Sequence, residues 1–543
     1  MTNPIVVILL HFHEEDQQAR DAASCDAAQI PVVFSKWPAG IDHIATFVKS
    51  FQVGYPGDWI QDWCAQYGNT IRIKIFYESD IFTIEPENIK AILATDFDNF
   101  GKGPNDIRIQ QSLLGFGIFN TNGNNLIAFI SKPNKLPNQL NEMWKFHRSL
   151  SRPFFTRERI NDFAIFGRHA HSTLAQLKKR LAEGHPVDFQ DLVARFTLDS
   201  ATEFLFGRSV DSISADLPYP RSSPLSTSSS FLDHPANVFG PLWLLREFWK
   251  DRIKPHRKII DDYMEPTLHE ELEKKKAKEG KDDKPDEEAG TFLSQLVQST
   301  DNKEVIRDSI VNIMAAGRDT TAATLTFGVY MLAEHPEILQ KLRKEILDAV
   351  GNSKMPSYDD LRKMKYLRAF INETLRLYPP VPFDGRTSKN ATTWPPIKPG
   401  DKPLYVPPNT QCNYCLFWMH RRTDLWGPDV LASTFDPDRF LDERVRKYLT
   451  PNPFIFLPFN AGPRICLGQQ FAYHEVSFFL VRLLQNFSTI TLAPDAQEDW
   501  AKPPASWKDR KGTQATEKIM LGINLTLYVK GGLWVTMKEA AAE

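Results

Sequence analysis

The stretch FNAGPRICLG, residues 459–468, contains the cysteine on which the interpretation of this chain rests. Cys466 stands between Gly462 and Gly468, directly before a predicted helix. Glycine lets a backbone approach a flat ligand closely, and free N–H groups at a helix start stabilise a thiolate. A lone cysteine is more often a small buried apolar side chain, but the whole loop fits a ligand cradle better. The loop therefore predicts a ligand-binding thiolate, with Arg464 two residues away to meet an anionic group.

Helical patterns dominate the chain, and strand patterns occur near both ends. Residues 70–84 are rich in β-branched and aromatic side chains and predict a β-hairpin. The tail 525–537 predicts a last hairpin turned by Gly531 and Gly532. We expect a mainly α fold with a smaller β-rich lobe, forming a single domain over residues 36–543.

Helices are predicted over 156–206 (with a break near 183–186), and one helix each over 303–333 and 468–485. The middle of the helix over 303–333, residues 310–316, is apolar on nearly every side and is expected to be buried all round. A further helical stripe is formed by Leu361, Met364, Leu367, Ile371 and Leu375.

Composition and charge exclude several classes of protein. The 543 residues are 42% hydrophobic and 24% charged, which is ordinary for a globular chain. The net charge of -2 gives no basic field, so no nucleic-acid partner is expected. Five scattered cysteines do not form a disulfide framework. Residues 1–35 are poorly defined by pattern, because the apolar run 5–10 is too short to span a bilayer and lacks a basic segment before it.

Charged and aromatic residues on two helices form further candidate constellations. Glu373 and Arg376 share one helix face, and Arg439 could complete a buried triad that fixes geometry. On a surface such a pair would be uninformative. Trp144 and Arg148 are four residues apart, so an indole N–H and a guanidinium can converge on one carboxylate. A surface cation–π pair is the alternative.

Small residues, an acid and hydroxyls interrupt the long central helix at 316–321, AGRDTT. Glycine costs helix stability there, and threonine can bond back to the preceding turn. The segment is either a packing notch or a pocket for a small ligand beside a proton relay.

These segments resemble, in the same order along the chain, the motifs of the cytochrome P-450 superfamily. The resemblance covers roughly Lys36 to Met537 and is closest to fungal membrane-bound members that hydroxylate alkanes and fatty acids. It implies these roles: Cys466 as the axial ligand of a haem iron, Asp319 and Thr320 as the catalytic acid–alcohol pair, Trp144, Arg148, Arg386 and Arg464 as haem contacts, and Glu373, Arg376 and Arg439 as a structural triad.

The resemblance also implies cofactor, partners and location. Haem b would lie between the central helix and the cysteine loop, and one atom of O2 would be inserted into an apolar, lipid-like substrate. Electrons would come from a separate NADPH-dependent flavoprotein reductase, with cytochrome b5 as a further candidate donor. Gly101-Lys102-Gly103 lacks the third glycine and the preceding strand of a dinucleotide loop. Peripheral attachment to the cytoplasmic face of the endoplasmic reticulum is expected.

Two features depart from the family pattern or compete with it. Residues 124–143 stand where the family has a short turn, and they are either unspliced intron sequence or a loop near the haem. Cys412 and Cys415 have the spacing of a zinc or redox pair, but no second pair accompanies them, so we interpret them as part of a strand.

Three other functions remain open at this stage. They are a peroxide-using haem enzyme, a non-catalytic haem-binding protein, and a defective product whose haem contacts are disrupted by 124–143. Asp319 and Thr320 argue against the peroxide-using enzyme. The expected substrate pocket is apolar and lined by residues 111–119, the helix face near 315–316, residues 381–383 and the turn 519–521.

Overall fold

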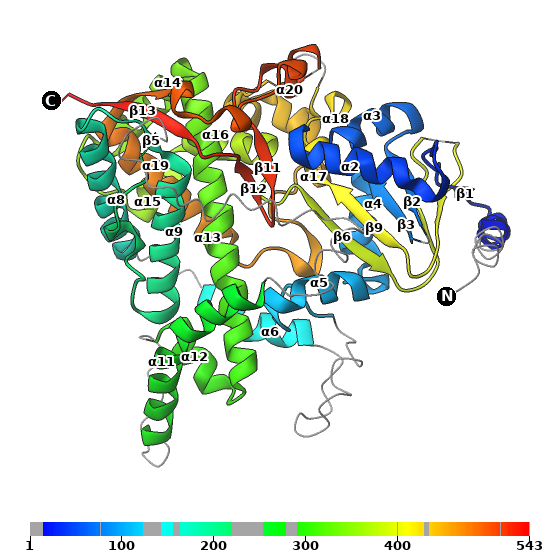
Figure 1. Cartoon of the computed structure of the whole chain (residues 1–543), viewed down its shortest axis with the longest axis horizontal. Helices are drawn as coiled ribbons and strands as arrows, with labels where there is room; N and C mark the ends of the chain where they lie inside the picture. Colours follow the sequence, from blue (N-terminus) through cyan, green and yellow to red (C-terminus); the bar gives the residue numbers. More distant parts are fainter. Residues whose placement is uncertain are drawn as a thin grey trace.

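A computed structural model describes residues 15–76, 78–122, 143–155, 163–219, 253–278, 290–398, 400–427, 434–510 and 512–541. Helices form most of it, and a smaller β-rich lobe lies beside them (Figure 1), as predicted. Nearly all of segment 124–143 lies outside the described residues.

The helices of the described chain surround one long central helix, α13. Their bounds are α2 (Ile41–Val53), α3 (Asp58–Tyr67), α4 (Pro86–Lys90), α5 (Pro104–Leu114), α6 (Met143–Ser151), α8 (Ala164–Ala182), α9 (Phe189–Phe206), α11 (Lys254–Lys278), α12 (Phe292–Ser299), α13 (Lys303–Glu334), α14 (Pro336–Val350), α15 (Tyr358–Lys363), α16 (Lys365–Leu377), α17 (Leu416–Met419), α18 (Thr423–Trp426), α19 (Gln469–Asn486) and α20 (Thr513–Thr516).

Helix α13 is the framework of the helical part. The Asn302 side chain begins it by accepting hydrogen bonds from the N–H groups of Glu304 and Val305, at 3.0 and 3.2 Å. It packs most extensively against α9 and also against α16 and α19. Figure 1 shows α13 between α8 and α9 on one side and the β-rich lobe on the other. The helix therefore separates the two halves of the fold and presents one face to each.

The β-rich lobe is built on a five-stranded sheet in the order β2-β3-β9-β6-β4. The bounds of all strands are β1 (Ala28–Gln29), β2 (Thr70–Ile75), β3 (Glu78–Thr83), β4 (Phe100–Gly101), β5 (Val187–Asp188), β6 (Phe383–Ser388), β7 (Thr392–Trp394), β8 (Leu404–Val406), β9 (Gln411–Cys415), β10 (Phe487–Leu492), β11 (Leu521–Ile523), β12 (Leu527–Val529) and β13 (Trp534–Glu539). Strands β2 and β3 form the predicted hairpin. Cys412 and Cys415 are buried on β9, where burial raises the pKa of both thiols.

The predicted hairpin at the tail is wrong. Strand β12 pairs with β11, whereas β13 pairs with β10 and β5. Gly531 and Gly532, at φ 72° and 86°, carry the chain from one sheet to the other. Residue alternation predicts a strand well, but it does not specify the partner of that strand, which here comes from distant parts of the chain.

Two helix predictions also need correction. The stripe from Leu361 to Leu375 is divided between α15 and α16, because the chain leaves helical geometry at Met364 (ψ 88°). The middle of α13 is not buried all round: residues 313–316 are partly exposed. Ile313, Ala315 and Ala316 line a cavity, which accounts for their accessible surface.

Residues that precede the predicted start of the domain, residue 36, also take part in the fold. Strand β1 pairs in parallel with β8, which joins residues 28–29 to the β-rich lobe. Among the described helices, none has the length and apolar character needed to cross a bilayer.

Candidate active site

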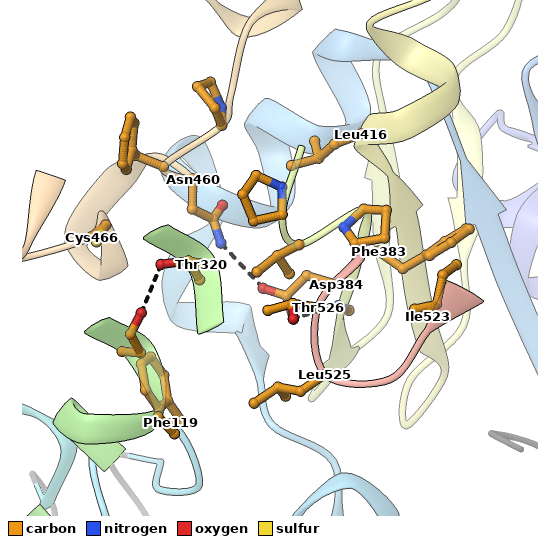
Figure 2. Close-up of a pocket in the computed structure, with 18 of the residues that line it drawn as sticks. Phe119, Thr320, Phe383, Asp384, Leu416, Asn460, Cys466, Ile523, Leu525 and Thr526 are labelled. Carbon is orange, nitrogen blue, oxygen red and sulfur yellow. Dashed lines mark hydrogen bonds between the residues drawn. The ribbon is translucent and has the colours of Figure 1, made fainter. Parts of the chain in front are cut away.

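A cavity of about 680 Å³ lies between α13, the cysteine loop and the β-rich lobe. Most of its wall near α13 is apolar, and Figure 2 shows Phe119, Phe383, Leu416, Ile523 and Leu525 around it. Parts of all four predicted pocket segments reach it: Leu114, Ile118 and Phe119; Ala315 and Ala316; Val381, Pro382 and Phe383; and Leu521. The cavity extends from Cys466 to Asp80 in the β2–β3 hairpin.

The loop before α19 presents Cys466 to this cavity. The Cys466 N–H donates to the carbonyl oxygen of Phe459 at 3.0 Å, which closes the loop. Gly462 has φ 68°, and a Cβ there would overlap the Leu93 carbonyl, so only glycine fits. Cys466 keeps accessible surface although protein surrounds it, because it lies in the cavity wall. Burial raises the pKa of its thiol, whereas the Gly468 N–H and Arg148 oppose that rise.

Two cationic side chains and an indole gather beside the loop. Arg148 donates to the Ile465 carbonyl at 2.9 Å, and its guanidinium lies 5.9 Å from the Trp144 ring centroid. The Arg464 guanidinium lies 4.9 Å from the same ring. The cation–π contact expected as the alternative is thus present, but all three side chains also line the cavity.

Arg464 lacks the partners that a buried cation requires. Its Nε is buried without a hydrogen-bond acceptor among the described residues, and its Nη2 donates to the Thr121 carbonyl at 2.9 Å. Burial, together with the nearby Arg386, lowers its pKa to about 9. A buried cation without a carboxylate partner is costly, so this position suits an anionic ligand group.

Arg386 lies on β6 at the same side of the cavity. Its Nη1 donates to Asp384 Oδ1 at 2.8 Å, and Lys102 Nζ donates to the same oxygen at 3.0 Å. Burial lowers the pKa of Lys102, and Arg386 lowers it further. The sequence pointed to Arg386 but not to Lys102 or Asp384.

The structure brings the three members of the predicted triad together. Arg376 donates to both Glu373 oxygens at 2.7 Å, and Arg439 Nε lies 3.5 Å from Glu373 Oε1. Glu373 and Arg376 are fully buried. Arg376 Nη1 also donates to the His420 carbonyl at 2.8 Å, so the triad connects α16 to the segments on either side of α18. None of its three members is among the described residues that line the cavity.

The two residues of the predicted acid–alcohol pair on α13, Asp319 and Thr320, lie in different surroundings. Thr320 lines the cavity, and its hydroxyl donates to the Ala316 carbonyl at 2.7 Å (Figure 2). Asp319 is not among the described lining residues and lies 3.4 Å from Arg318 Nε. Burial raises the pKa of Asp319, and Arg318 opposes that rise. Gly317 leaves open space on the wall, since a Cβ there would meet only Ala201 at 4.0 Å.

The Cytochrome P450 family matches residues 38–514 of the chain. The chain belongs to the cytochrome P450 family. It is 36% identical to Cytochrome P450 monooxygenase himC of Aspergillus japonicus, over 92% of this chain and 82% of that protein. It is also 36% identical to Cytochrome P450 52-M1 of Starmerella bombicola, over 77% of both chains. Identity to Cytochrome P450 52A3-A of Candida maltosa is 36% over 75% of both.

The residues of this cytochrome P450 fit haem b. Haem is flat and apolar and carries two carboxylates, and its iron takes an axial thiolate in this family. Cys466 would supply the sulfur, and the incompletely paired Arg464, with Arg148 and Arg386, would supply positive charge for the carboxylates. When bound, the haem supplies the oxygen chemistry of a monooxygenase, while the protein orients the substrate and controls protons. Trp144 and Arg148 lie at this site although they directly follow segment 124–143.

Three side chains at the cytochrome P450 site escaped the sequence interpretation: Lys102, Asp384 and Asn460. Lys102 belongs to the Gly-Lys-Gly motif that was compared only with nucleotide loops, and Asn460 lies inside the quoted cysteine loop. The signal available in the sequence was a lysine between two glycines. Their common partner, Asp384, is far from both in sequence, so no local pattern could connect them.

Proposed function

We propose that this cytochrome P450 hydroxylates an apolar chain of the alkane or fatty-acid type. The observation that supports this substrate class is the apolar wall that leads from Cys466 and Thr320 toward the β-rich lobe. We further propose that a separate NADPH-dependent flavoprotein reductase, with cytochrome b5 as an additional donor, supplies the electrons. The test is turnover of the haem-loaded protein with such a reductase and a series of alkanes, alcohols and fatty acids. Oxygenated product from none of them, despite normal haem loading, would reject this class.

Thr320 is proposed to hold the hydroxyl through which a proton is delivered, with Asp319 as the proton source. In Thr320→Ala we expect oxygen consumption to continue while product per oxygen consumed falls by about 10²-fold, the lower end for a positioned proton donor. Thr320→Ser should restore coupling. The matched control is Thr326→Ala, because Thr326 makes the same bond to Ala322 at 2.8 Å but is buried away from the cavity. Unchanged coupling in Thr320→Ala would show that the hydroxyl has no part in proton delivery.

The end of the cavity at the β2–β3 hairpin carries acids, and it should favour neutral chains over free carboxylates. Glu78, Asp80 and Asp106 line it. Burial, together with the charges of Glu78 and Asp106, raises the pKa of Asp80 to about 7. An anionic substrate end placed here meets carboxylates, and two unit charges about 4 Å apart cost about 1 kcal/mol even in bulk water.

We therefore expect Asp80→Asn to bind dodecanoate about fivefold more tightly relative to 1-dodecanol, as 1 kcal/mol implies. Because Asp80 gains its charge as pH rises through about 7, discrimination against dodecanoate in the parent should increase from about pH 6 to pH 8, where a free carboxylate stays ionised. Spectral titration of the haem-loaded protein with each ligand measures the affinity for dodecanoate relative to 1-dodecanol, in the variant and in the parent at each pH. Asp348→Asn, which removes an exposed acid distant from the cavity, should change neither this relative affinity nor its dependence on pH.

Attachment to the cytoplasmic face of the endoplasmic reticulum is proposed, with a peripheral apolar surface as support. Phe34 and Trp37 are 71% and 62% exposed, and Ile41 and Phe76 are also exposed. The Phe76 N–H donates to the Ala39 carbonyl oxygen at 2.8 Å, which brings Phe76 close to the segment that contains Trp37 and Ile41. Phe34→Ser with Trp37→Ser should weaken binding to phospholipid vesicles by about a hundredfold, given roughly 1.5 kcal/mol per buried aromatic side chain. Vesicle sedimentation measures it, and Val210→Ser, at an exposed site elsewhere, is the control.

A further inference from the structure

One carboxylate, Asp384, connects the two ends of the cofactor site. Its side chain retains 21% exposure and lines the cavity. Five groups donate to it: Gly385 N (2.7 Å), Arg386 Nη1 (2.8 Å) and Lys102 Nζ (3.0 Å) to Oδ1, and Tyr414 OH (2.9 Å) and Asn460 Nδ2 (3.1 Å) to Oδ2. Figure 2 shows the bond between Asn460 and Asp384. A carboxylate with five donors is unusually well satisfied for one on a cavity wall.

Four of the five donors come from different segments of the chain. Lys102 precedes α5, Arg386 lies on β6, Tyr414 lies on β9, and Asn460 belongs to the cysteine loop. Asn460 has φ 62°, a left-handed conformation that costs a non-glycine residue energy. The hydrogen bond from its side-chain amide to Asp384 offsets this cost. One carboxylate, Asp384, therefore contacts both the cysteine loop and the two cationic side chains, Lys102 and Arg386.

A second path joins Lys102 to Arg464. The Asn122 side chain accepts from the Lys102 N–H at 2.6 Å and donates to the Lys102 carbonyl at 2.5 Å. Arg464 donates to the Thr121 carbonyl, next to it. Lys102 is therefore held by its backbone and its side chain at once, and its glycine-bracketed turn is part of the cofactor cradle.

We propose that Asp384 is a positioning residue of the haem site, which holds Lys102 and Arg386 on the haem-carboxylate side and Asn460 on the thiolate side. Electrostatics agrees with this assignment. Burial acts to raise the pKa of Asp384, but Arg386 and Lys102 outweigh it and hold the pKa well below its ordinary value. Without this anion, Lys102, Arg386 and Arg464 would repel one another in a buried site.

The reduction potential of the bound haem separates this role from general stabilisation. A negative charge near the iron favours the oxidised form, so Asp384→Asn should raise the potential and Lys102→Met should lower it. A merely structural effect has no reason to produce opposite signs. The control is Asp199→Asn, because Asp199 is fully buried, accepts two backbone N–H groups at 2.8 and 3.0 Å and does not line the cavity. That variant should leave the potential unchanged.

Haem retention gives a second, independent readout. Transfer of haem to excess apomyoglobin should be about tenfold or more faster from Asp384→Asn, the scale of a lost charge-assisted hydrogen bond, and unchanged in Asp199→Asn. The double variant Asp384→Asn with Lys102→Met should lose haem more slowly than the two single effects combined predict, because the two groups act on each other.

The cysteine-loop contact is tested by Asn460→Gly, which removes the amide but tolerates the left-handed backbone. It should lower the fraction of ferrous–CO protein that keeps the thiolate-type Soret band. If Asp384→Asn does not load haem, the potential of Lys102→Met and the band of Asn460→Gly decide the matter. Potential shifts of the same sign or none, haem loss equal to that of Asp199→Asn, or an unaltered band in Asn460→Gly would each overturn the proposal.

Discussion

Cys466→Ala is expected to abolish the strongly red-shifted Soret band of the reduced, CO-bound protein. That band requires a thiolate on the ferrous haem, and Cys466 is the only cysteine among the described residues that lines the cavity. Its loop is shaped around the sulfur by Gly462 and by the bond from the Cys466 N–H to Phe459. Alanine preserves the backbone and removes only the ligand, so the loss should be complete.

The controls for this prediction come from the other cysteines. Cys25→Ala, at an exposed site, and Cys415→Ala, at a buried site on β9, should both keep the band. The measurement is the CO difference spectrum of each purified variant, with total haem determined separately. A parent protein that shows only a band typical of histidine-ligated or denatured haem would mean that this chain does not assemble the site. A parent-like band in Cys466→Ala would assign the ligand to another residue.

The sequence could predict those juxtapositions that involve residues close together in the chain. Cys466 and Arg464 lie in one loop, and Glu373 and Arg376 lie one helical turn apart, so residue spacing alone places each pair. The β2–β3 hairpin was predicted for the same reason, since its strands are adjacent in the chain. In each case the interactions that determine the arrangement are between residues close together in the chain.

The parts that were missed depend on contacts between distant residues. Asp384 receives donors from Lys102 and Asn460, which lie far before and after it in the chain. Strand β13 pairs with β10 rather than with β12, because sheet partners are chosen by tertiary packing. The partial exposure of Ala315 and Ala316 on α13 arises from the cavity, and hydrophobic periodicity cannot distinguish a cavity wall from a packed core.

Arg376→Met is expected to lower the free energy of unfolding by about 3–5 kcal/mol, the usual result of removing one partner of a buried ion pair. Glu373 would remain fully buried with the Asp436 N–H at 2.9 Å and Arg439 at 3.5 Å. The substitution would also weaken the support of the cysteine loop. His420 Nε2 accepts from the Leu457 N–H at 3.1 Å, and its Nδ1 lies 3.1 Å from the Arg376 carbonyl. Burial lowers the pKa of His420 to about 3, so it connects α16 to the loop as a neutral ring.

The matched comparison is Lys344→Met, which breaks the exposed pair of Lys344 with Asp348, 74% and 65% exposed, and should cost less than about 1 kcal/mol. Denaturant unfolding followed by both tryptophan fluorescence and haem absorbance measures the two changes. Because the triad holds the segment that carries the cysteine loop, we expect the haem signal of Arg376→Met to be lost at lower denaturant than its fluorescence signal. Adding Glu373→Gln should recover part of the stability, since the unpaired buried charge is then removed. If Arg376→Met is no more destabilising than Lys344→Met, the triad does not stabilise the fold, and the cysteine loop must be held by other contacts.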